Sequence, residues 1–429
     1  MPHPIDRSAH TTPRWIARIV VVTGLVGVAG GIAGIAVFLA LHLIQVVAFG
    51  FPFHTGAEAA DEPDPFRRFA AVLAAGVLAA VGWWALRRFG RPVVSVHGAV
   101  GGARMPSLVT VGNAGIQILA VGLGASIGKE VAPREIGAWL SQLVTERAGL
   151  TTRETKILVA CGAAAGLAAV YDVPLGGALF AVEVLLGEIT FATALPAFAT
   201  SAIAAFVARL VVPVETLYDV PHMTMSPSLL VWSIIVGPVL GFAGVGFVRL
   251  TTALQTHQPR GWRILVVMPM VFALVGVVAV FVPEIMGNGR ATGLAAMNAD
   301  LSGPAVLGLA PILFMLVLAI AKTATTVGTI GAGAAGGTLT PSIAIGAAAG
   351  AFLGGAWMLL WPGSGLAAFA FVGAAAFLAT TLRAPFTALV LVVEFTGQGP
   401  TILIPTLLAV SGAVAVGYVL GRRRLVGVA

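Results

Sequence analysis

The sequence predicts an all-α membrane protein with many spanning segments, and three features of its composition support this prediction. Charged residues make up only 10% of the 429 residues, whereas a soluble domain carries about 25%. Apolar residues reach 58%, and the mean hydropathy is +1.00. A water-soluble fold of this size could not cover its surface with 24 basic and 17 acidic side chains.

Composition also excludes several other classes. The 54 glycines show no Gly-X-Y period, which excludes collagen, and glycine in a membrane lets helices pack closely or break. The net charge of +7 would suggest a nucleic-acid partner for a soluble protein, but in a membrane protein basic residues mark cytoplasmic ends, so we expect no nucleic acid. The single Cys161 excludes an internal disulfide, and the seven histidines lack ligand spacing, so we expect no metal and no cofactor.

Three segments are expected along the chain. They are a polar N-terminal segment (1–14), a first membrane repeat (15–212) and a second membrane repeat (213–425), with no C-terminal regulatory domain. The apolar run at the N-terminus is too long for a cleavable signal peptide. Arginines flank both ends of the membrane region, which places both termini in the cytoplasm. These arginines are Arg7, Arg14, Arg18, Arg422, Arg423 and Arg424.

Long apolar runs are the helix candidates, and many are interrupted by Gly, Pro or a polar residue. The first, Trp15–Phe49, would span about 50 Å as a helix against a hydrocarbon core of about 30 Å, so it must be strongly tilted. The others are Phe69–Leu86, Ile157–Leu186, Ala192–Val212, Leu229–Leu254, Ile264–Val282 and Val306–Ile320, and Val93–Pro133 is too broken for a simple span. Broken helices that point at a common centre are typical of secondary transporters.

An internal duplication is predicted from two segments that match at an offset of 211 residues. Gly162–Glu183 reads GAAAGLAAVYDVPLGGALFAVE, and Gly373–Glu394 reads GAAAFLATTLRAPFTALVLVVE. The proline lies 12 residues after the glycine in both segments, and the glutamate lies 21 residues after it. A matched proline and a matched intramembrane glutamate do not arise easily by chance. Paired interrupted helices favour an inverted repeat.

The first candidate site is the stretch Gly128–Pro133, which reads GKEVAP and follows a run of glycines. Glycines followed by an acid and a proline predict a loop that turns into a helix N-terminus. Such a terminus favours an anion, because it offers backbone N–H groups and the positive end of the helix dipole. The Glu130 carboxylate can occupy that anion site itself, and protonation would let an external anion replace it. The alternative is that Glu130 only stabilises a helix start at an interface.

The second candidate is Gly331–Pro341, whose glycine turn, Thr338, Thr340 and Pro341 predict another helix N-terminus facing the first. It contains GxGxxG, but a dinucleotide site needs an acidic residue about 20 residues further on. No Asp or Glu occurs between Gly337 and Val393, so we reject a nucleotide site.

Two further candidates have simpler alternatives. Gly101–Pro106, which reads GGARMP, is a third helix opening of the same type, and its alternative is a connecting turn with a surface arginine. Tyr418 ends the last apolar run, where its phenol could donate to an anion. The commoner explanation for an aromatic residue there is a position at the membrane interface.

The motifs in this order resemble the CLC family of chloride channels and proton-coupled anion transporters. GGARMP, GKEVAP and GGTLTP lie where that family has GSGIP, GREGP and GGIFAP, and the two repeat segments are also similar to it. The resemblance implies a CLC-like bundle with an inverted repeat and a homodimer in a bacterial cell membrane, with one pore per subunit and halide and protons as partners. The dimer would meet through helices in Ala178–Val212 and Ala388–Ser411. It further implies Glu130 as the external gating glutamate. The implied anion-binding residues are Ala103, Met105, Gly128, Lys129, Val131, Thr338, Leu339, Thr340 and Tyr418.

Departures from the family pattern bear on which anion is carried. The pore serine of the family is lost, and Ala103 or Met105 must fill its space. Proton-coupled chloride exchangers close the first repeat with two adjacent acids, but here Glu183 is followed by Val184. These losses resemble the subclass that exports fluoride in exchange for protons, which we favour. Loss of the inner acid alone would equally suit a chloride channel, so chloride transport is the alternative.

Two assignments stay open from the sequence. Glu183 and Glu394 occupy equivalent repeat positions at the end of an apolar run, and an acid at the membrane edge that holds a helix end or a dimer contact explains them better than a transport role. An intramembrane enzyme would need a nucleophile with a base or paired aspartates, which the apolar runs lack. We therefore expect a transporter or channel rather than an enzyme.

Overall fold

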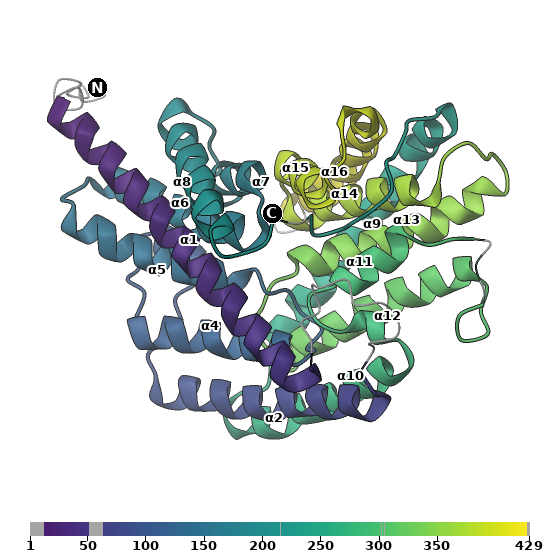
Figure 1. Ribbon diagram of the computed structural model, residues 1–429, viewed down its shortest axis with the longest axis horizontal. Coiled ribbons are helices and arrows are strands. Elements are labelled where there is room, and N and C mark those ends of the chain that lie inside the picture. Colours follow the sequence, from purple (N-terminus) through teal and green to yellow (C-terminus); the bar gives the residue numbers. More distant parts are fainter. Residues whose placement is uncertain (1–12, 51–62, 215, 302, 304, 427–429) are drawn as a thin grey trace. The chain divides into compact units, whose positions relative to one another are not determined.

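The computed structural model describes residues 13–50, 63–214, 216–301, 303 and 305–426, the last six by their backbone only. Arg7 and the side chains of Arg422, Arg423 and Arg424, which support the predicted orientation, lie outside this description. The described part is almost entirely helical, as predicted (Figure 1).

The helices of the first half of the chain are α1 (Pro13–Phe49), α2 (Pro65–Phe89), α3 (Val96–Val100), α4 (Ser107–Gly122), α5 (Val131–Arg147), α6 (Thr152–Tyr171), α7 (Pro174–Leu179), a π-helical turn (Phe180–Leu186) and α8 (Phe191–Arg209). Those of the second half are α9 (Pro227–Thr256), α10 (Ile264–Phe281), α11 (Arg290–Met297), α12 (Pro311–Gly331), α13 (Leu339–Met358), α14 (Leu366–Leu382), α15 (Pro385–Thr396) and α16 (Leu403–Val426), with 3-10 turns at Gly261–Arg263, Pro283–Ile285 and Pro400–Ile402. Within the described residues, nine helices are long and apolar enough to cross a membrane.

Two compact units make up the chain, and neither is continuous in sequence. Unit 1 contains Met1–Ala36, Val93–Thr110 and Pro133–Pro213, and unit 2 contains Val37–Pro92, Val111–Ala132 and Val214–Ala429. The units therefore do not follow the expected division into residues 15–212 and 213–425, and that repeat boundary stays a prediction.

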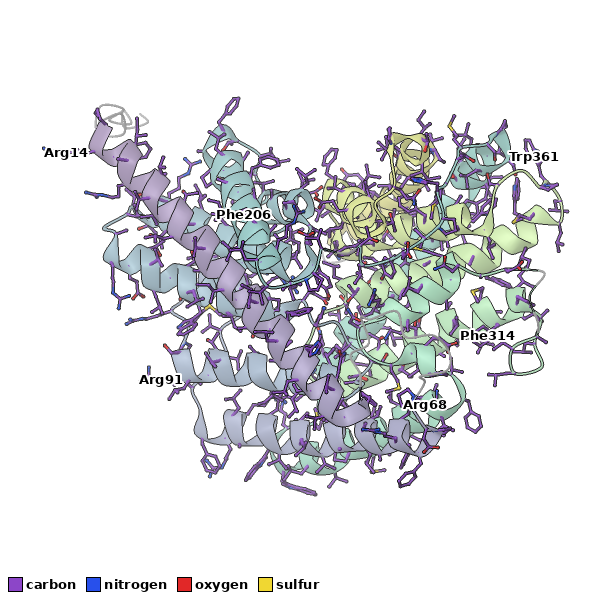
Figure 2. The ribbon with its side chains drawn as sticks, in the orientation of Figure 1. Arg14, Arg68, Arg91, Phe206, Phe314 and Trp361 are labelled. Carbon is purple, nitrogen blue, oxygen red and sulfur yellow. The ribbon has the colours of Figure 1, made fainter. Side chains whose placement is uncertain are left out.

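Each unit has its own packing. In unit 1, α6, α7 and α8 pack against one another. In unit 2, α2 and α10 lie side by side (Figure 1), α9 packs on α16, and α13 packs on α11, α12 and α14. Many large apolar side chains of the helices are exposed: Phe206 of α8, for example, is 65% exposed, whereas Phe314 of α12 is buried (Figure 2). Exposed apolar side chains of this kind are expected on a surface that faces lipid rather than water.

The predicted runs match helices with two differences. The run Ile157–Leu186 is not one helix, because α6 ends where Asp172 takes a left-handed conformation (φ 55°) and Pro174 starts α7. The run Val306–Ile320 begins too early. Residues 306–309 form a tight turn, and α12 starts at Pro311, whose fixed φ suits the first helical position, and runs on to Gly331.

The duplicated segments have the same local structure, which supports the predicted duplication. Tyr171 and Leu382, 211 residues apart, each end a helix. Each is followed by a residue in the left-handed conformation, Asp172 or Arg383, both with φ 55°. A proline then opens the next short helix in both segments. The π-helical turn that contains Glu183 has no counterpart in α15. Since a π turn holds an extra residue, it explains why the following glycines, Gly187 and Gly397, are 210 rather than 211 residues apart.

Glycines allow the closest helix crossing in unit 2. A methyl group at Gly350 of α13 would lie 2.9 Å from the Cα of Gly373 and 2.6 Å from the carbonyl oxygen of Phe369, both on α14. By contrast, a methyl group at Gly328 of α12 would meet only a Val271 methyl group at 3.6 Å, an ordinary contact.

This difference gives the first prediction. Gly350→Ala should destabilise the protein by about 1–3 kcal/mol, because the two backbones must separate. Gly328→Ala should be neutral or slightly stabilising, because alanine favours the helix. Thermal unfolding of the two purified variants in the same detergent measures this, and equal unfolding temperatures would contradict the close-packed crossing.

Candidate functional site

Glu130 lies in unit 2 at the point where a glycine-rich loop leads into α5, whose first residue is Val131. Its side chain is fully buried. The carboxylate accepts hydrogen bonds from the backbone N–H of Leu339 (2.7 Å to Oε1) and from the hydroxyl of Thr340 (3.2 Å to Oε2). The predicted helix starts after both glycine loops are confirmed, and the two loops meet at this carboxylate.

The N-terminus of α13 is the feature that holds the carboxylate. α13 begins at Leu339, and the preceding Thr338 makes no side-chain cap to it. The first N–H groups of a helix have no partner within the helix, and together with the dipole they attract negative charge. The Glu130 carboxylate therefore occupies a position at which an anion would be favoured.

A short antiparallel contact joins the two loops. Gly128 N–H donates to the Gly337 carbonyl (2.8 Å), and Gly337 N–H donates back to the Gly128 carbonyl (3.1 Å). A methyl group at either glycine would overlap the Glu130 carboxylate. These positions therefore need glycine for a steric reason, since only a bare backbone leaves room for the carboxylate.

Lys322 of α12 holds the loop that precedes Glu130 through a hydrogen bond. Its buried ammonium donates to the hydroxyl of Ser126 (2.9 Å) and to the carbonyls of Ile285 and Gly287 (2.8 Å each). It thus ties α12 both to the loop before Glu130 and to the turn before α11. All three of these hydrogen-bond partners are neutral groups.

Basic side chains lie around Glu130. Lys129 and Lys322 both interact electrostatically with Glu130, and so does the phenol of Tyr218. Arg290, the first residue of α11, interacts with Lys129 and Tyr218. Glu284 lies in the turn that packs against α11, so the region holds acidic as well as basic groups. Basic groups close to the Glu130 carboxylate favour an anion at that position.

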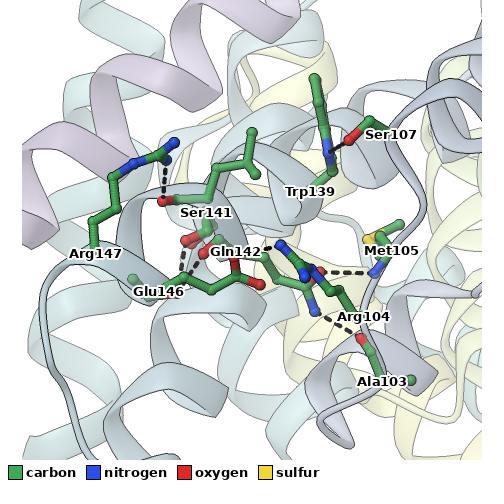
Figure 3. Close-up of polar contacts among 11 residues, drawn as sticks. Ala103, Arg104, Met105, Ser107, Trp139, Ser141, Gln142, Glu146 and Arg147 are labelled. Carbon is green, nitrogen blue, oxygen red and sulfur yellow. Dashed lines mark hydrogen bonds and ion pairs between the residues drawn. The ribbon is translucent and has the colours of Figure 1, made fainter.

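The loop Gly101–Pro106, in which Ala103 or Met105 is predicted to fill the space of the family's pore serine, belongs to unit 1. Met105 is buried, its backbone N–H donates to the Gln142 side chain (3.0 Å), and the Gln142 amide donates to the carbonyl of Ala103 (2.8 Å) (Figure 3). Gln142 lies on α5, the helix that begins directly after Glu130. The amide side chain therefore fixes the backbone of this loop, and α4 opens after Pro106 as predicted.

Other candidates from the sequence lie elsewhere. Tyr418 of α16 is 59% exposed, which favours its alternative as an interfacial aromatic. Glu183 and Glu394 are both half-buried near the ends of their helices. The anion-binding roles of the predicted residues stay predictions.

Sequence reasoning missed the partners of the site. Lys322 carried one usable signal, since it and Arg383 are the only charged residues between Pro304 and Val393. An isolated charge in a long apolar stretch marks a functional or structural site by default. Arg290, Tyr218 and Gln142 carried no comparable signal.

Comparisons with known proteins identify the class. The fold is that of a multi-pass membrane protein, and a buried carboxylate lies on a helix N-terminus inside it. A sequence model described as voltage gated chloride channel matches residues 71–418. The H(+)/Cl(-) exchange transporter ClcA of Vibrio parahaemolyticus is 30% identical over 375 residues, covering 82% of this chain and 77% of the relative. The chain therefore belongs to the voltage gated chloride channel family, the CLC family.

Solved structures show the same fold. The structure of a slow cyanobacterial Cl-/H+ antiporter has a TM-score of 0.79 at 22% identity, covering 94% of this chain and 95% of the other. The structure of a CLC-type fluoride/proton antiporter has a TM-score of 0.73 at 18% identity, covering 95% and 97%. The predicted CLC-like helical fold is thus confirmed. The relatives are named as transporters and channels, which fits the expectation of a non-enzyme at that coarse level.

The Lys322 contacts give the second prediction. Lys322→Met should lower the free energy of unfolding by about 2–4 kcal/mol, because it leaves the carbonyls of Ile285 and Gly287 facing an apolar side chain without their donor. Lys156→Met, at an exposed position of α6, is the matched control and should change it by less than about 0.5 kcal/mol. Thermal or denaturant unfolding in detergent tests this, and an equal effect of the two substitutions would contradict the structural role of Lys322.

Proposed function

We propose that this protein is a proton-coupled anion antiporter in which the Glu130 carboxylate and the transported anion compete for the N-terminus of α13. The observation that carries the proposal is the buried Glu130 carboxylate on the Leu339 N–H and the Thr340 hydroxyl. These donors suit a halide as well as a carboxylate, so one position serves both.

Protonation is the step that exchanges the two occupants. An ionised carboxylate accepts charge-assisted hydrogen bonds, which are about twice as strong as neutral ones. When Glu130 takes up a proton it loses this advantage, leaves the donors and makes room for an anion. The displaced carboxyl gives up its proton before the anion departs, and the charged carboxylate then returns to the donors. Each cycle therefore couples the movement of a proton to the movement of an anion.

Fluoride is the anion that we favour, and chloride is the alternative. The lack of a hydroxyl at Ala103 and Met105 and the valine after Glu183 resemble the fluoride-exporting subclass. On the other side, the relative from Vibrio is named as an H(+)/Cl(-) exchanger, which supports chloride.

A passive chloride channel is the second candidate, favoured by one observation. Glu183 is followed by Val184, so the second acid that relays protons in the chloride exchangers is absent. In a channel Glu130 would gate anion flow without moving a proton in each cycle.

Assembly and orientation belong to the same proposal. We place two copies in a bacterial cell membrane, with both termini in the cytoplasm and contact through helices in Ala178–Val212 and Ala388–Ser411. Exposed apolar side chains in these ranges support that choice, among them Phe191 (87%) and Ile404 (54%).

Substitution of Glu130 tests the coupling and gives the third prediction. In liposomes, Glu130→Gln should reduce anion-driven proton movement to that of protein-free liposomes, because an amide cannot ionise, while passive anion flux persists. Glu188→Gln, an exposed acid that pairs with Arg153, is the control and should keep the coupling. Proton movement by Glu130→Gln at the rate of the unchanged protein would reject the assignment of Glu130.

Anion choice is tested separately, as the fourth prediction. Efflux of fluoride from reconstituted liposomes should exceed that of chloride at least about tenfold, which corresponds to about 1.4 kcal/mol of discrimination. External pH is recorded in the same run with ion-selective electrodes. Faster chloride efflux would overturn the choice of fluoride, and chloride efflux without a pH change would favour the channel.

A further inference from the structure

Tyr218 carries a buried hydroxyl that none of the described residues satisfies. The residue lies in the segment between α8 and α9, its side chain is fully buried, and its Oη has no hydrogen-bond partner in the described structure. Burying a hydroxyl without a partner costs about 1–3 kcal/mol. A phenylalanine would fill the same space without that cost, so the hydroxyl needs an explanation other than packing.

Several contacts hold the ring of Tyr218 in one place. Its backbone N–H donates to the carbonyl of Phe395 (2.8 Å), and the two rings meet edge to face with centroids 6.3 Å apart. A methyl group at Gly293 of α11 would lie 3.1 Å from the phenol oxygen and 2.5 Å from the ring. The hydroxyl therefore lies against the first turn of α11, beside Arg290.

The first turn of α11 leads directly to the Glu130 site. A methyl group at Gly289, the residue before α11, would lie 3.3 Å from the carbonyl oxygen of Thr340 and 3.2 Å from Cε of Lys322. Thr340 is the residue whose hydroxyl binds Glu130. Tyr218 also interacts electrostatically with both Arg290 and Glu130. The unsatisfied hydroxyl is thus within the electrostatic reach of the carboxylate.

The proposed transport cycle requires a second position for that carboxylate. An anion can bind the Leu339 N–H and the Thr340 hydroxyl only after Glu130 has left them. A displaced carboxylate that is buried without a donor would be strongly destabilised. Some group must therefore receive it whenever it is displaced in the charged form.

Other donors near the site are already engaged. Lys322 donates to three oxygens, and the Nε of Arg290 donates to the carbonyl of Leu217 (2.8 Å). Lys129 lies next to Glu130 in sequence and is half-buried. Glu284, which is also half-buried, is the further acid nearby and lies in the turn packed against α11. The Tyr218 hydroxyl differs from these groups because its proton has no acceptor among the described residues.

We infer that the Tyr218 hydroxyl is the receiving hydrogen-bond donor for the displaced Glu130 carboxylate, and thus a positioning residue of the transport cycle. The inference rests on the proposed function, because it needs Glu130 to leave the N-terminus of α13. It assigns the unsatisfied hydroxyl a partner in the second state of the cycle. Tyr218 does not touch the anion, and it acts only through Glu130.

The test compares anion efflux by Tyr218→Phe and by the unchanged protein across pH. A donor to the charged carboxylate matters only where Glu130 ionises, so the two rates should be similar at acid pH. The deficit of Tyr218→Phe should grow as the pH rises and reach about tenfold, the size of one hydrogen bond to a charged group. Tyr218→Phe should unfold at an equal or higher temperature, because it removes an unsatisfied hydroxyl. Tyr171→Phe, which removes a buried phenol on α6, is the matched control and should show no pH-dependent deficit.

A second comparison separates this inference from the proposed function. In the Glu130→Gln background, Tyr218→Phe should cause no further loss of passive anion efflux, because no carboxylate remains to be received. An equal loss in both backgrounds would overturn the inference and indicate contact with the anion instead. Unchanged efflux by Tyr218→Phe at every pH would also overturn it. Either result leaves the proposed function standing if Glu130→Gln still abolishes proton coupling, whereas retained coupling in Glu130→Gln rejects the function itself.

Discussion

The contact between a carboxylate and the first turn of α13 is the constraint on which the rest of the site depends. Leu339 presents a backbone N–H that no helical residue can satisfy, and Glu130 satisfies it from 209 residues away. For this to happen two loops must approach within the length of one backbone hydrogen bond, which Gly128 and Gly337 allow because they carry no side chain. The approach in turn requires the preceding segments to be held in place. Lys322 holds one of them through the hydroxyl of Ser126 (2.9 Å), and Arg87 of α2 holds the other through the carbonyl of Gly333 (2.7 Å).

Local features of the site could be predicted from the sequence, because they depend on local chemistry. Glycine followed by proline marks the end of a loop and the start of a helix, so α4, α5 and α13 begin where the motifs indicate. Glu130 directly precedes α5, and this helix start is predicted to favour an anion because of its free N–H groups and its dipole. The resemblance to the CLC family supplied the expectation that these loops converge, and the Glu130 contacts with Leu339 and Thr340 bear out that pairing within unit 2.

Long-range partners could not be predicted, because nothing local specifies them. Ser126, Ile285 and Gly287 bind Lys322 through a hydroxyl and two backbone carbonyls, groups that many residues in this sequence could provide. The break in the run Ile157–Leu186 was missed for a different reason. A left-handed conformation is usually signalled by glycine, and Asp172 is not glycine. The conformation is recognised only in the structure, where Arg383 at the equivalent position of the second repeat shares it. The π-helical turn around Glu183 could not be predicted either. Its only trace in the sequence is one additional residue before Gly187, compared with the segment before Gly397.

The neutral surroundings of Lys322 explain how one group can serve both structure and charge. A buried ammonium is usually balanced by a carboxylate, and the pair then has little net effect on its surroundings. Here the three hydrogen-bond partners of the ammonium are a hydroxyl and two carbonyls, and no carboxylate is among them. The same group that ties α12 to two loops also interacts electrostatically with Glu130. In the proposed cycle both occupants of the α13 N-terminus are negative, so a positive charge nearby would stabilise each of them, and the exchange between them would depend on the proton on Glu130.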